Sequence, residues 1–273
     1  MIETFAKVES TRELAPGYRL LTLDLKQDIS ARPGQFAMLK PRGSIEPLLR
    51  RALAVYRIHG PRRLSFLYQV LGRGTEALSQ IEQHGEVAIL LPLGNSWPIN
   101  EPAPQRAIVV AGGIGSASVL TLCEELAAAQ VDSQLFFGAA SDRAAAGCGL
   151  EDFRNLRLPI TLTTDDGSLG ERGFVTQPLE RYLRAGGGLS ATLYACGPWV
   201  MMRRVAELAA QFDVRCFVSL EAPMGCGFGV CVGCVVAVNS GGQLGYESYK
   251  RVCTDGSIFP AELIRWEINA MTH

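Results

Sequence analysis

The chain has 273 residues, of which 48% are hydrophobic and 19% are charged, and its formal net charge is −1. This composition allows substantial hydrophobic cores and excludes a disordered chain, while the near-neutral charge gives no reason to expect a nucleic-acid partner. The N-terminal stretch lacks the apolar segment of a signal peptide, and glycines interrupt the longest apolar runs short of a membrane span. We therefore expect a cytoplasmic protein, without a membrane contact, of one large domain or two to three smaller ones.

Residues 1–100 predict an antiparallel β-barrel. Stretches with β-rich composition or alternation follow one another, with turn signals such as "APG" and "RPG" between them. These expected strands are 6–14, 18–25, 34–40, 51–59, 63–70 and 85–92. A short helix is expected within 74–83.

A segment rich in proline and asparagine, 94–105, is typical of a linker, and the pattern changes after it. Apolar strands are expected at 106–113, 133–140, 159–166 and 191–197, and helices at 116–130, 151–156, 175–185 and 198–212. Alternating strands and helices predict a doubly wound parallel sheet over 101–215, with a ligand site at the carboxyl ends of its strands.

A glycine-rich turn follows the first strand of this sheet. The strand is expected to end at Ala111 and the helix to begin near Ser116, so phosphate could meet free N–H groups at the helix N-terminus. Gly113, Gly115 and Ser118 only approximate the dinucleotide fingerprint. A plain strand-to-helix turn is the alternative.

Two further strand ends carry small or polar residues. "TTDDGSLGERG" places Asp165 and Asp166 after one strand, either as ligand contacts or as a loop that caps itself through side-chain hydrogen bonds. "YACGP" places Cys196, Gly197 and Pro198 after another.

The C-terminal part, 216–273, contains a cysteine cluster. Cys226, Cys231 and Cys234 form C-x4-C-x2-C, and Cys253 follows further on, which is the plant-type [2Fe–2S] ligand order. Flanking glycines would let the loop wrap closely and free backbone N–H groups for the sulfurs. Zinc is the main alternative, but its sites normally use two C-x2-C pairs or histidines; unligated thiols are a third reading. We interpret the scattered Cys123, Cys148 and Cys216 as buried hydrophobes.

The order barrel, nucleotide-binding sheet and cysteine cluster resembles the ferredoxin-reductase superfamily. Within it, the chain is most similar to the electron-transfer subunits of class 1B dihydroorotate dehydrogenases over nearly its whole length. The stretches that carry the resemblance are "PLLRRALAVYRI", "FLYQVLGRGTEALS", "LPLGNSW", "AGGIGSA", "TTDDGSLGERGFVT", "YACGP", "SLEAPMGCGFGVCVGC" and "YKRVCTDGSIF".

The resemblance implies FAD on the barrel. The family's R-P-x-S string, which lines the flavin and its phosphates, aligns here with Arg51, Ala52, Leu53 and Ala54. Arginine suits phosphate because its fork donates paired, charged hydrogen bonds, whereas the family's proline and serine are alanines here. Further residues that the resemblance assigns to the flavin, its ribose or its diphosphate are Leu67, Tyr68, Gln69, Gly74 and Thr75.

The resemblance also implies NAD(H) on the second domain. Its diphosphate and nicotinamide side would lie on Gly112, Gly113, Ile114 and Gly115, and its nicotinamide would face Cys196, Gly197 and Pro198. The chain departs from the family pattern at Trp199, where an acid is usual, and at Ser118, where a proline is usual.

By resemblance, the chain would pass electrons between NAD(H), FAD and a [2Fe–2S] cluster to or from an FMN-containing dihydroorotate dehydrogenase catalytic subunit, in a heterotetramer of two of each chain. No acid–base pair or nucleophile in the sequence demands an organic substrate of its own. The alternatives are the reductase of an oxygenase, the electron-transfer subunit of a hydrogenase or another dehydrogenase, and a non-catalytic, zinc-binding form of the fold.

Overall fold

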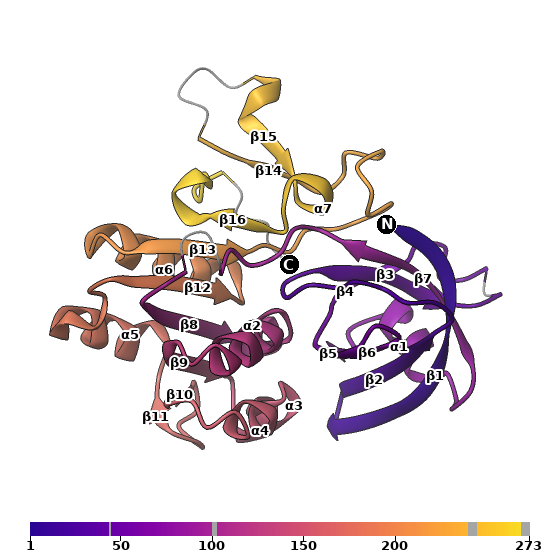
Figure 1. Cartoon of the computed structure of the whole chain (residues 1–273), viewed down its shortest axis with the longest axis horizontal. Helices are drawn as coiled ribbons and strands as arrows, with labels where there is room; N and C mark the ends of the chain where they lie inside the picture. Colours follow the sequence, from indigo (N-terminus) through magenta and orange to yellow (C-terminus); the bar gives the residue numbers. More distant parts are fainter. Residues whose placement is uncertain (44, 100–102, 240–244, 269–273) are drawn as a thin grey trace.

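The structure is a computed structural model that describes residues 1–43, 45–99, 103–239 and 245–268. Within these residues the strands form two seven-stranded sheets and one two-stranded sheet. In Figure 1 the N-terminal sheet and the helix-covered second sheet lie side by side, and the C-terminal segment (yellow) lies across both. Among the described residues, no helix combines the length and the apolar character needed to cross a membrane.

The N-terminal sheet is antiparallel throughout and confirms the predicted barrel. Its strand order is β4-β3-β7-β1-β2-β6-β5. β4 and β5 lie at opposite edges of this order, although only Val55 and Tyr56 separate them in the chain, so the sheet has to curl until its edges meet. The strands and the one helix are β1 (Ile2–Ala15), β2 (Tyr18–Leu25), β3 (Phe36–Pro41), β4 (Arg51–Ala54), β5 (Arg57–Gly60), β6 (Arg63–Gln69), α1 (Arg73–Ser79) and β7 (Glu86–Leu93).

The expected strand 51–59 is two strands, because the chain changes partners halfway along it. The N–H of Val55 donates to the carbonyl of Gln35, next to β3, whereas the N–H of Tyr56 donates to the carbonyl of Ser65 in β6. The segment therefore crosses from one edge of the barrel to the other.

The second sheet has the order β11-β10-β9-β8-β12-β13-β16. Its strands run parallel except β16, which is antiparallel to β13. α2, α3 and α4 contribute to one hydrophobic core and α5 and α6 to another, which confirms the doubly wound arrangement. The elements are β8 (Arg106–Gly112), α2 (Ser116–Ala128), β9 (Asp132–Ala139), α3 (Asp142–Gly147), α4 (Leu150–Arg154), β10 (Ile160–Thr164), β11 (Glu171–Arg172), α5 (Thr176–Tyr182), β12 (Ala191–Cys196), α6 (Trp199–Gln211), β13 (Arg215–Ser219) and β16 (Ile258–Pro260).

The C-terminal segment is anchored to both larger sheets. After a long loop it forms the hairpin β14 (Val235–Ala237) and β15 (Tyr249–Arg251), the short helix α7 (Val252–Asp255) and then β16. β16 completes the second sheet, and the boundary expected after residue 215 falls at the start of β13, which is also part of that sheet. On the barrel side, a Cβ on Gly227 would lie 2.5 Å from Cγ of Met38 in β3, so this loop lies directly on the barrel.

The start of the expected linker is packed rather than free. Asn95 accepts the N–H of Ile258 at 2.9 Å and donates to its carbonyl at 2.8 Å. The ring nitrogen of the buried Trp97 donates to the carbonyl of Ser118 in α2. Residues 100–102 of the expected linker lie outside the described residues.

We predict that Asn95→Ala loosens β16 from the barrel, because both hydrogen bonds to Ile258 are lost and two part-buried backbone groups are left without them. The free energy of unfolding in urea should fall by about 1–3 kcal/mol. The exposed Asn155 is the control, since Asn155→Ala should change the unfolding midpoint little. Equal midpoints for wild type and Asn95→Ala would show that this pair does not hold the segment.

Candidate cofactor-binding sites

Arg51 lies at the barrel edge beside the start of α1. A Cβ on Gly74 would come within 1.8 Å of Nε of Arg51, so only a glycine leaves room for the guanidinium at this place. The arginine is oriented by its own loop, because Nη1 donates to the carbonyls of Leu49 and Arg50. The first N–H groups of a helix have no acceptor within it. A cation, a backbone free of side chain and the first N–H groups of a helix thus meet in a cradle that fits a diphosphate.

Thr75 uses its hydroxyl to close the start of α1. Its Oγ1 accepts the N–H groups of Leu71 and Gly72 and donates to the carbonyl of Gly72. The hydroxyl therefore caps the helix.

The other residues expected at the flavin divide between two faces. Leu67 packs in the core shared with the second sheet, beside Ala54, whereas its neighbour Tyr68 packs in the barrel core. Successive strand residues point to opposite faces, so Leu67 and Gln69 share one face and Tyr68 the other. Burial raises the pKa of Tyr68 to about 12, and its buried hydroxyl has no hydrogen-bond partner among the described residues.

The glycine turn and the "CGP" turn meet at the centre of the second sheet. β8 ends at Gly112 and β12 at Cys196, and these strands are neighbours, with Ala111 opposite Cys196. From β8 the chain continues to β9 on one side, and from β12 to β13 on the other, so the two turns flank the topological switch point where open sheets bind ligands.

Glycines at positions 115 and 197 allow these turns to touch. A Cβ on Gly115 would lie 2.6 Å from the carbonyl carbon and oxygen of Cys196, and one on Gly197 would lie 2.9 Å from Cα of Gly112. Gly113 differs, because its φ is +53° and a Cβ there would meet nothing within 4 Å. Gly113 is therefore the open position of the turn, whereas a Cβ on Gly112 would lie 2.4 Å from Sδ of Met201 and one on Gly115 would meet Cys196.

Cys196 turns its thiol inward. Its side chain is 2% exposed and interacts with the hydroxyls of Ser219 and Ser118, and burial raises its pKa to about 12. Ser118 also donates to Ser219 at 3.0 Å. The surface of this turn is consequently formed by Gly197 and Pro198.

Trp199, at the start of α6, contacts the C-terminal segment. Its ring lies 4.7 Å from that of Trp266, centroid to centroid. Trp199, which stands where the family usually has an acid, therefore packs the chain next to the "CGP" turn against the C-terminal segment.

The acidic turn after β10 caps itself. Asp166 accepts both the N–H and the hydroxyl of Ser168, at 2.9 and 2.7 Å, and these bonds lower its pKa. This is the self-capping alternative that the sequence left open.

The four clustered cysteines interact with one another, and Cys226 of the long loop also acts on Cys253 beyond the hairpin. Cys226 and Cys231 interact side chain to side chain within the long loop. Cys234 and Cys253 also interact side chain to side chain. They lie close together because β14 pairs with β15 and the N–H of Val252 donates to the carbonyl of Cys234. The hairpin thus brings the distant fourth cysteine to the loop.

The thiols of the two pairs differ in ionisation. Burial opposes ionisation of Cys226, but hydrogen bonds from the backbone of Cys231, Phe228 and Val230 outweigh it and lower the pKa to about 6. Burial and the neighbouring Cys234 raise the pKa of Cys253 to about 12. Backbone N–H groups aimed at a sulfur are what a thiolate ligand requires.

Within the described residues, no three or more His, Cys, Asp or Glu side chains converge to hold a metal ion. A structural zinc needs all its ligands around one ion, whereas a [2Fe–2S] cluster takes two thiolates on each of two irons. The spacing of the four cysteines follows the order of plant-type cluster ligands.

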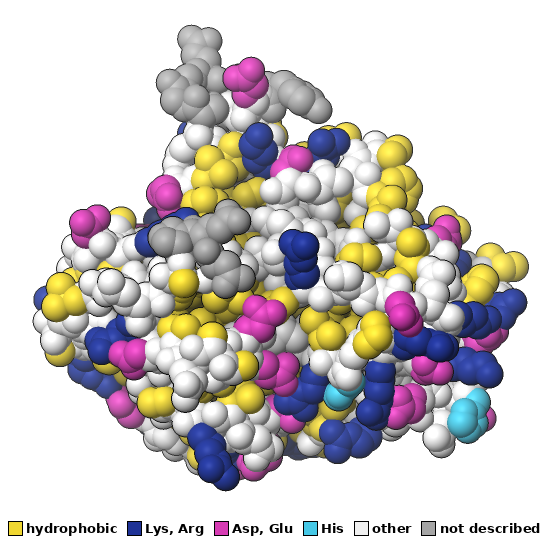
Figure 2. Space-filling model, viewed as in Figure 1, with side chains coloured by type: hydrophobic (Ala, Val, Ile, Leu, Met, Phe, Trp, Pro, Cys, Tyr) yellow, Lys and Arg dark blue, Asp and Glu magenta, His cyan; other side chains and the backbone are white. Residues whose placement is uncertain are grey.

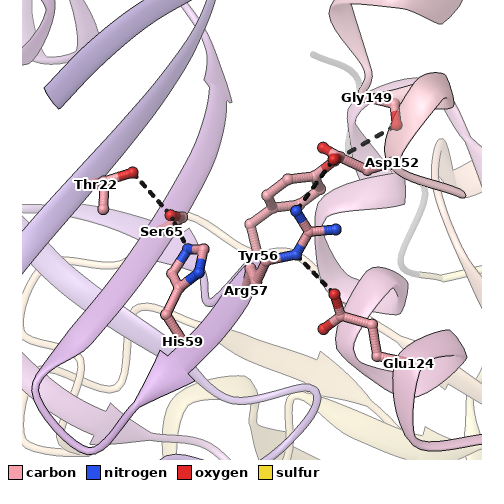
Figure 3. Close-up of polar contacts among 8 residues, drawn as sticks. All are labelled: Thr22, Tyr56, Arg57, His59, Ser65, Glu124, Gly149 and Asp152. Atoms are coloured by element: carbon pink, nitrogen blue, oxygen red, sulfur yellow. Dashed lines mark hydrogen bonds and ion pairs between the residues drawn. The ribbon is translucent and has the colours of Figure 1, made fainter. Parts of the chain in front are cut away.

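One cross-domain group was missed by sequence reasoning. Tyr56 and Arg57 of the barrel contact Glu124 and Asp152 of the second sheet's helices (Figure 3). Partners so far apart in the sequence leave no spacing signal.

We predict that Gly115→Ala destabilises the second sheet, because its Cβ would overlap the backbone of Cys196. The expected loss is about 1–3 kcal/mol in urea unfolding followed by circular dichroism. Gly72 has extended backbone and open space around it, so Gly72→Ala should cost less, at most about 1 kcal/mol through poorer helix capping. Equal losses for both variants would contradict the packing role of Gly115.

Comparison with known proteins places this architecture in a family. Residues 221–265 match the family model described as the iron-sulfur cluster binding domain of dihydroorotate dehydrogenase B. The dihydroorotate dehydrogenase B (NAD⁺) electron transfer subunit of Desulforamulus reducens is 36% identical over 265 residues, covering 96% of this chain and 98% of that one. The Geobacillus kaustophilus subunit is 37% identical over 256 residues, covering 93% and 92%.

Solved structures support the fold. A structure of an NADH-dependent reduced ferredoxin-NADP oxidoreductase, studied for electron bifurcation, superposes with a TM-score of 0.80 at 23% identity, covering 97% of this chain and 91% of that one. Phthalate dioxygenase reductase gives a TM-score of 0.66 at 16% identity, covering 87% of each chain. With its barrel, its doubly wound sheet and its paired cysteines, and with relatives that match it almost end to end, the chain belongs to the family of dihydroorotate dehydrogenase B electron transfer subunits.

Proposed function

We propose that this chain is an NAD(H)-dependent iron–sulfur flavoprotein subunit that carries electrons between NAD(H) and an FMN-containing dihydroorotate dehydrogenase catalytic subunit. The near end-to-end match to electron transfer subunits supports this function. We place it in the cytoplasm, where free cysteines stay reduced, in a heterotetramer of two of each chain. The third module would begin after β13, near residue 221, where the family model begins to match.

The observation that carries the proposal is the arrangement of the four cysteines. Cys226 and Cys231 would hold one iron, and Cys234 and Cys253 the other. The loop that bears the first pair rests on the barrel through Gly227, against Met38 and Leu93. A cluster bound here would sit beside the barrel, which is the position an electron carrier needs.

The cradle of Arg51 and Gly74 would hold the FAD diphosphate, with β4 along the flavin. Arg51 contributes positive charge, and the first turn of α1 contributes N–H donors. Since residues 52 and 54 are alanines, backbone groups of β4 would replace the family's serine hydroxyl as donors. When bound, FAD supplies the exchange between the hydride of NADH and single electrons.

The switch point of the second sheet would hold NAD(H). Gly113 offers an open backbone position, and α2, which begins directly after the turn, directs its N-terminus toward a bound diphosphate. Gly197 and Pro198 would face the nicotinamide, while the thiol of Cys196 supports the turn from inside.

The reductases of oxygenases share the fold, as the likeness to phthalate dioxygenase reductase shows. The curated relatives favour dihydroorotate dehydrogenase as the partner instead. The match of residues 221–265 to an iron-sulfur cluster binding domain argues against a zinc-binding form of the fold.

We predict that Cys226→Ser prevents cluster assembly and leaves reduction of FAD by NADH in place, because the cysteine lies outside both proposed nucleotide sites. Protein purified without oxygen should lose its iron and sulfide while retaining flavin absorbance that NADH bleaches. Cys123→Ala, which removes a buried thiol of α2, is the control and should retain the cluster. Zinc instead of iron in the wild-type protein, without flavin, would refute the proposed function.

An exposed apolar surface surrounds the cysteine loop. Leu48, Leu49 and Phe228 line a hollow of about 340 Å³ next to Cys226, together with the cationic Lys40 and Arg50, and Val230 is 73% exposed nearby in the chain. On the face shown in Figure 2, charges of both signs are interspersed, and apolar side chains gather at the upper right, over the cysteine loop and the adjacent barrel end. Exposed apolar patches of this kind mark protein contacts, and we assign this one to the catalytic subunit.

We predict that Leu48→Asp weakens binding to the catalytic subunit by about tenfold or more, because it removes apolar contact and places a charge in the interface. Isothermal titration of the two purified subunits measures the change. Leu189 is equally exposed, at 77%, but it lies just before the amino end of β12, in the second sheet and outside the cysteine loop. Leu189→Asp is therefore the matched control, and equal weakening by the two variants would remove the assignment.

A further inference from the structure

Four side chains join the barrel to the second sheet in a single polar network (Figure 3). Arg57, the first residue of β5, donates from Nε to Glu124 at 2.7 Å and from Nη1 to Asp152 at 3.1 Å. The hydroxyl of Tyr56 donates to the other oxygen of Asp152 at 2.6 Å. We call Tyr56, Arg57, Glu124 and Asp152 the junction network.

On the barrel side, the network is held rigidly. Ser65, which pairs with Arg57 across β5 and β6, accepts the backbone N–H of Tyr56. Its hydroxyl bonds in turn to Thr22 at 2.9 Å and to the ring of His59 at 2.8 Å, as Figure 3 shows. The backbone that carries Arg57 is therefore fixed to the barrel wall.

On the sheet side, the carboxylates come from two helices, Glu124 from α2 and Asp152 from α4. Gly149, just before α4, has a φ of +77°, and a Cβ there would lie 2.1 Å from the hydroxyl of Tyr56. The glycine is what allows the tyrosine to reach Asp152. The backbone conformation of Gly149 and the contact of Tyr56 with Asp152 therefore both fit a single relative position of the two modules.

The junction network differs from an ordinary surface ion pair, which contributes little to stability. Tyr56 is fully buried, and the side chains of Arg57, Glu124 and Asp152 are only 26%, 29% and 22% exposed. One arginine serves two carboxylates, and both oxygens of Asp152 are engaged, so the geometry is fixed in more than one direction. Burial and the adjacent Asp152 carboxylate raise the pKa of Tyr56, which keeps its hydroxyl a donor.

The position of the junction network connects the two proposed nucleotide sites. In the barrel, only Val55 separates Tyr56 from β4, the proposed flavin strand. In the sheet, α2 starts directly after the glycine turn, and Glu124 lies about 12 Å further along its axis. One short, rigid segment of the chain therefore connects each end of the junction network to a proposed cofactor site.

We propose that Arg57 is a positioning residue which, through Glu124 and Asp152, sets the orientation of the nicotinamide site relative to the flavin site. The inference rests on the proposed function, because it assigns no chemistry to the arginine itself. Arg57 fixes an angle between modules, and hydride transfer depends on that angle. A misplacement of about 1 Å between reacting groups can cost about a hundredfold in rate.

The test uses the full chain with FAD and cluster bound, and NADH as the reductant. In anaerobic stopped-flow experiments, Arg57→Met should lower the limiting rate of FAD reduction by about tenfold or more. The NADH concentration for half-maximal rate should change less than about threefold, since neither site is itself altered. Glu124→Gln keeps the shape of its side chain and should shift the rate in the same direction, and Arg57→Lys should restore part of it.

A second readout does not depend on turnover. Hydrogen–deuterium exchange should become faster in segments 55–60, 116–128 and 150–154 of Arg57→Met, with the rest of the barrel unchanged. The control is Arg63→Met, which breaks the ion pair to Glu9 within the barrel and should leave both readouts as in wild type.

A wild-type limiting rate in Arg57→Met, even with faster exchange, would overturn the inference and leave the network a purely stabilising role. An equal loss in Arg63→Met would overturn it as well. Failure of NADH to reduce FAD in the wild-type protein would instead refute the proposed function.

Discussion

The passage of the chain from β4 to β5 through Val55 and Tyr56 is the constraint on which the rest of the structure depends. Because these residues hydrogen-bond to opposite edges of the sheet, the barrel can close only if the chain crosses there. The same crossing ends with Tyr56 and Arg57 directed at the second sheet. Barrel closure and module orientation are thereby set by one short segment, next to the strand proposed for the flavin.

Close backbone contact holds the remaining parts together. Gly227 brings the cysteine loop onto Met38, and Gly115 brings the glycine turn onto Cys196. A side chain at position 227 would push the cysteine loop away from the barrel, and one at position 115 would push apart two turns of the same sheet. Many of the glycines that the sequence suggested for ligand binding are therefore explained first by contacts between parts of the protein, with Gly113 the clear exception.

The sequence predicted most of the fold because its signals were local. Alternation and turn residues indicated the barrel strands, and the strand–helix rhythm indicated the doubly wound sheet. Cys123, Cys148 and Cys216 are buried as expected.

The break at Val55–Tyr56 was missed, since partner exchange leaves the β pattern intact. β16 was missed because three residues carry no periodicity, and its place in the second sheet depends on distant partners. The junction network was missed because its partners are distant in the sequence. Its charged residues lie in segments with no shared spacing, and each alone is typical of a solvent-exposed side chain.

The four clustered cysteines differ in how deeply they are buried, which distinguishes an inner side of the site from an outer one. Cys234 and Cys253 are each 2% exposed, whereas Cys226 is partly exposed and Cys231 is exposed. A ligand set of this kind has an inner pair, fixed by the β14–β15 hairpin, and an outer pair on a loop bordered by Phe228 and Val230. A protein that covers the apolar surface would come into contact with the outer pair without disturbing the hairpin. The surface proposed for the partner includes Leu49, whose carbonyl orients Arg51, so this surface borders the proposed FAD cradle as well as the outer pair of cysteines.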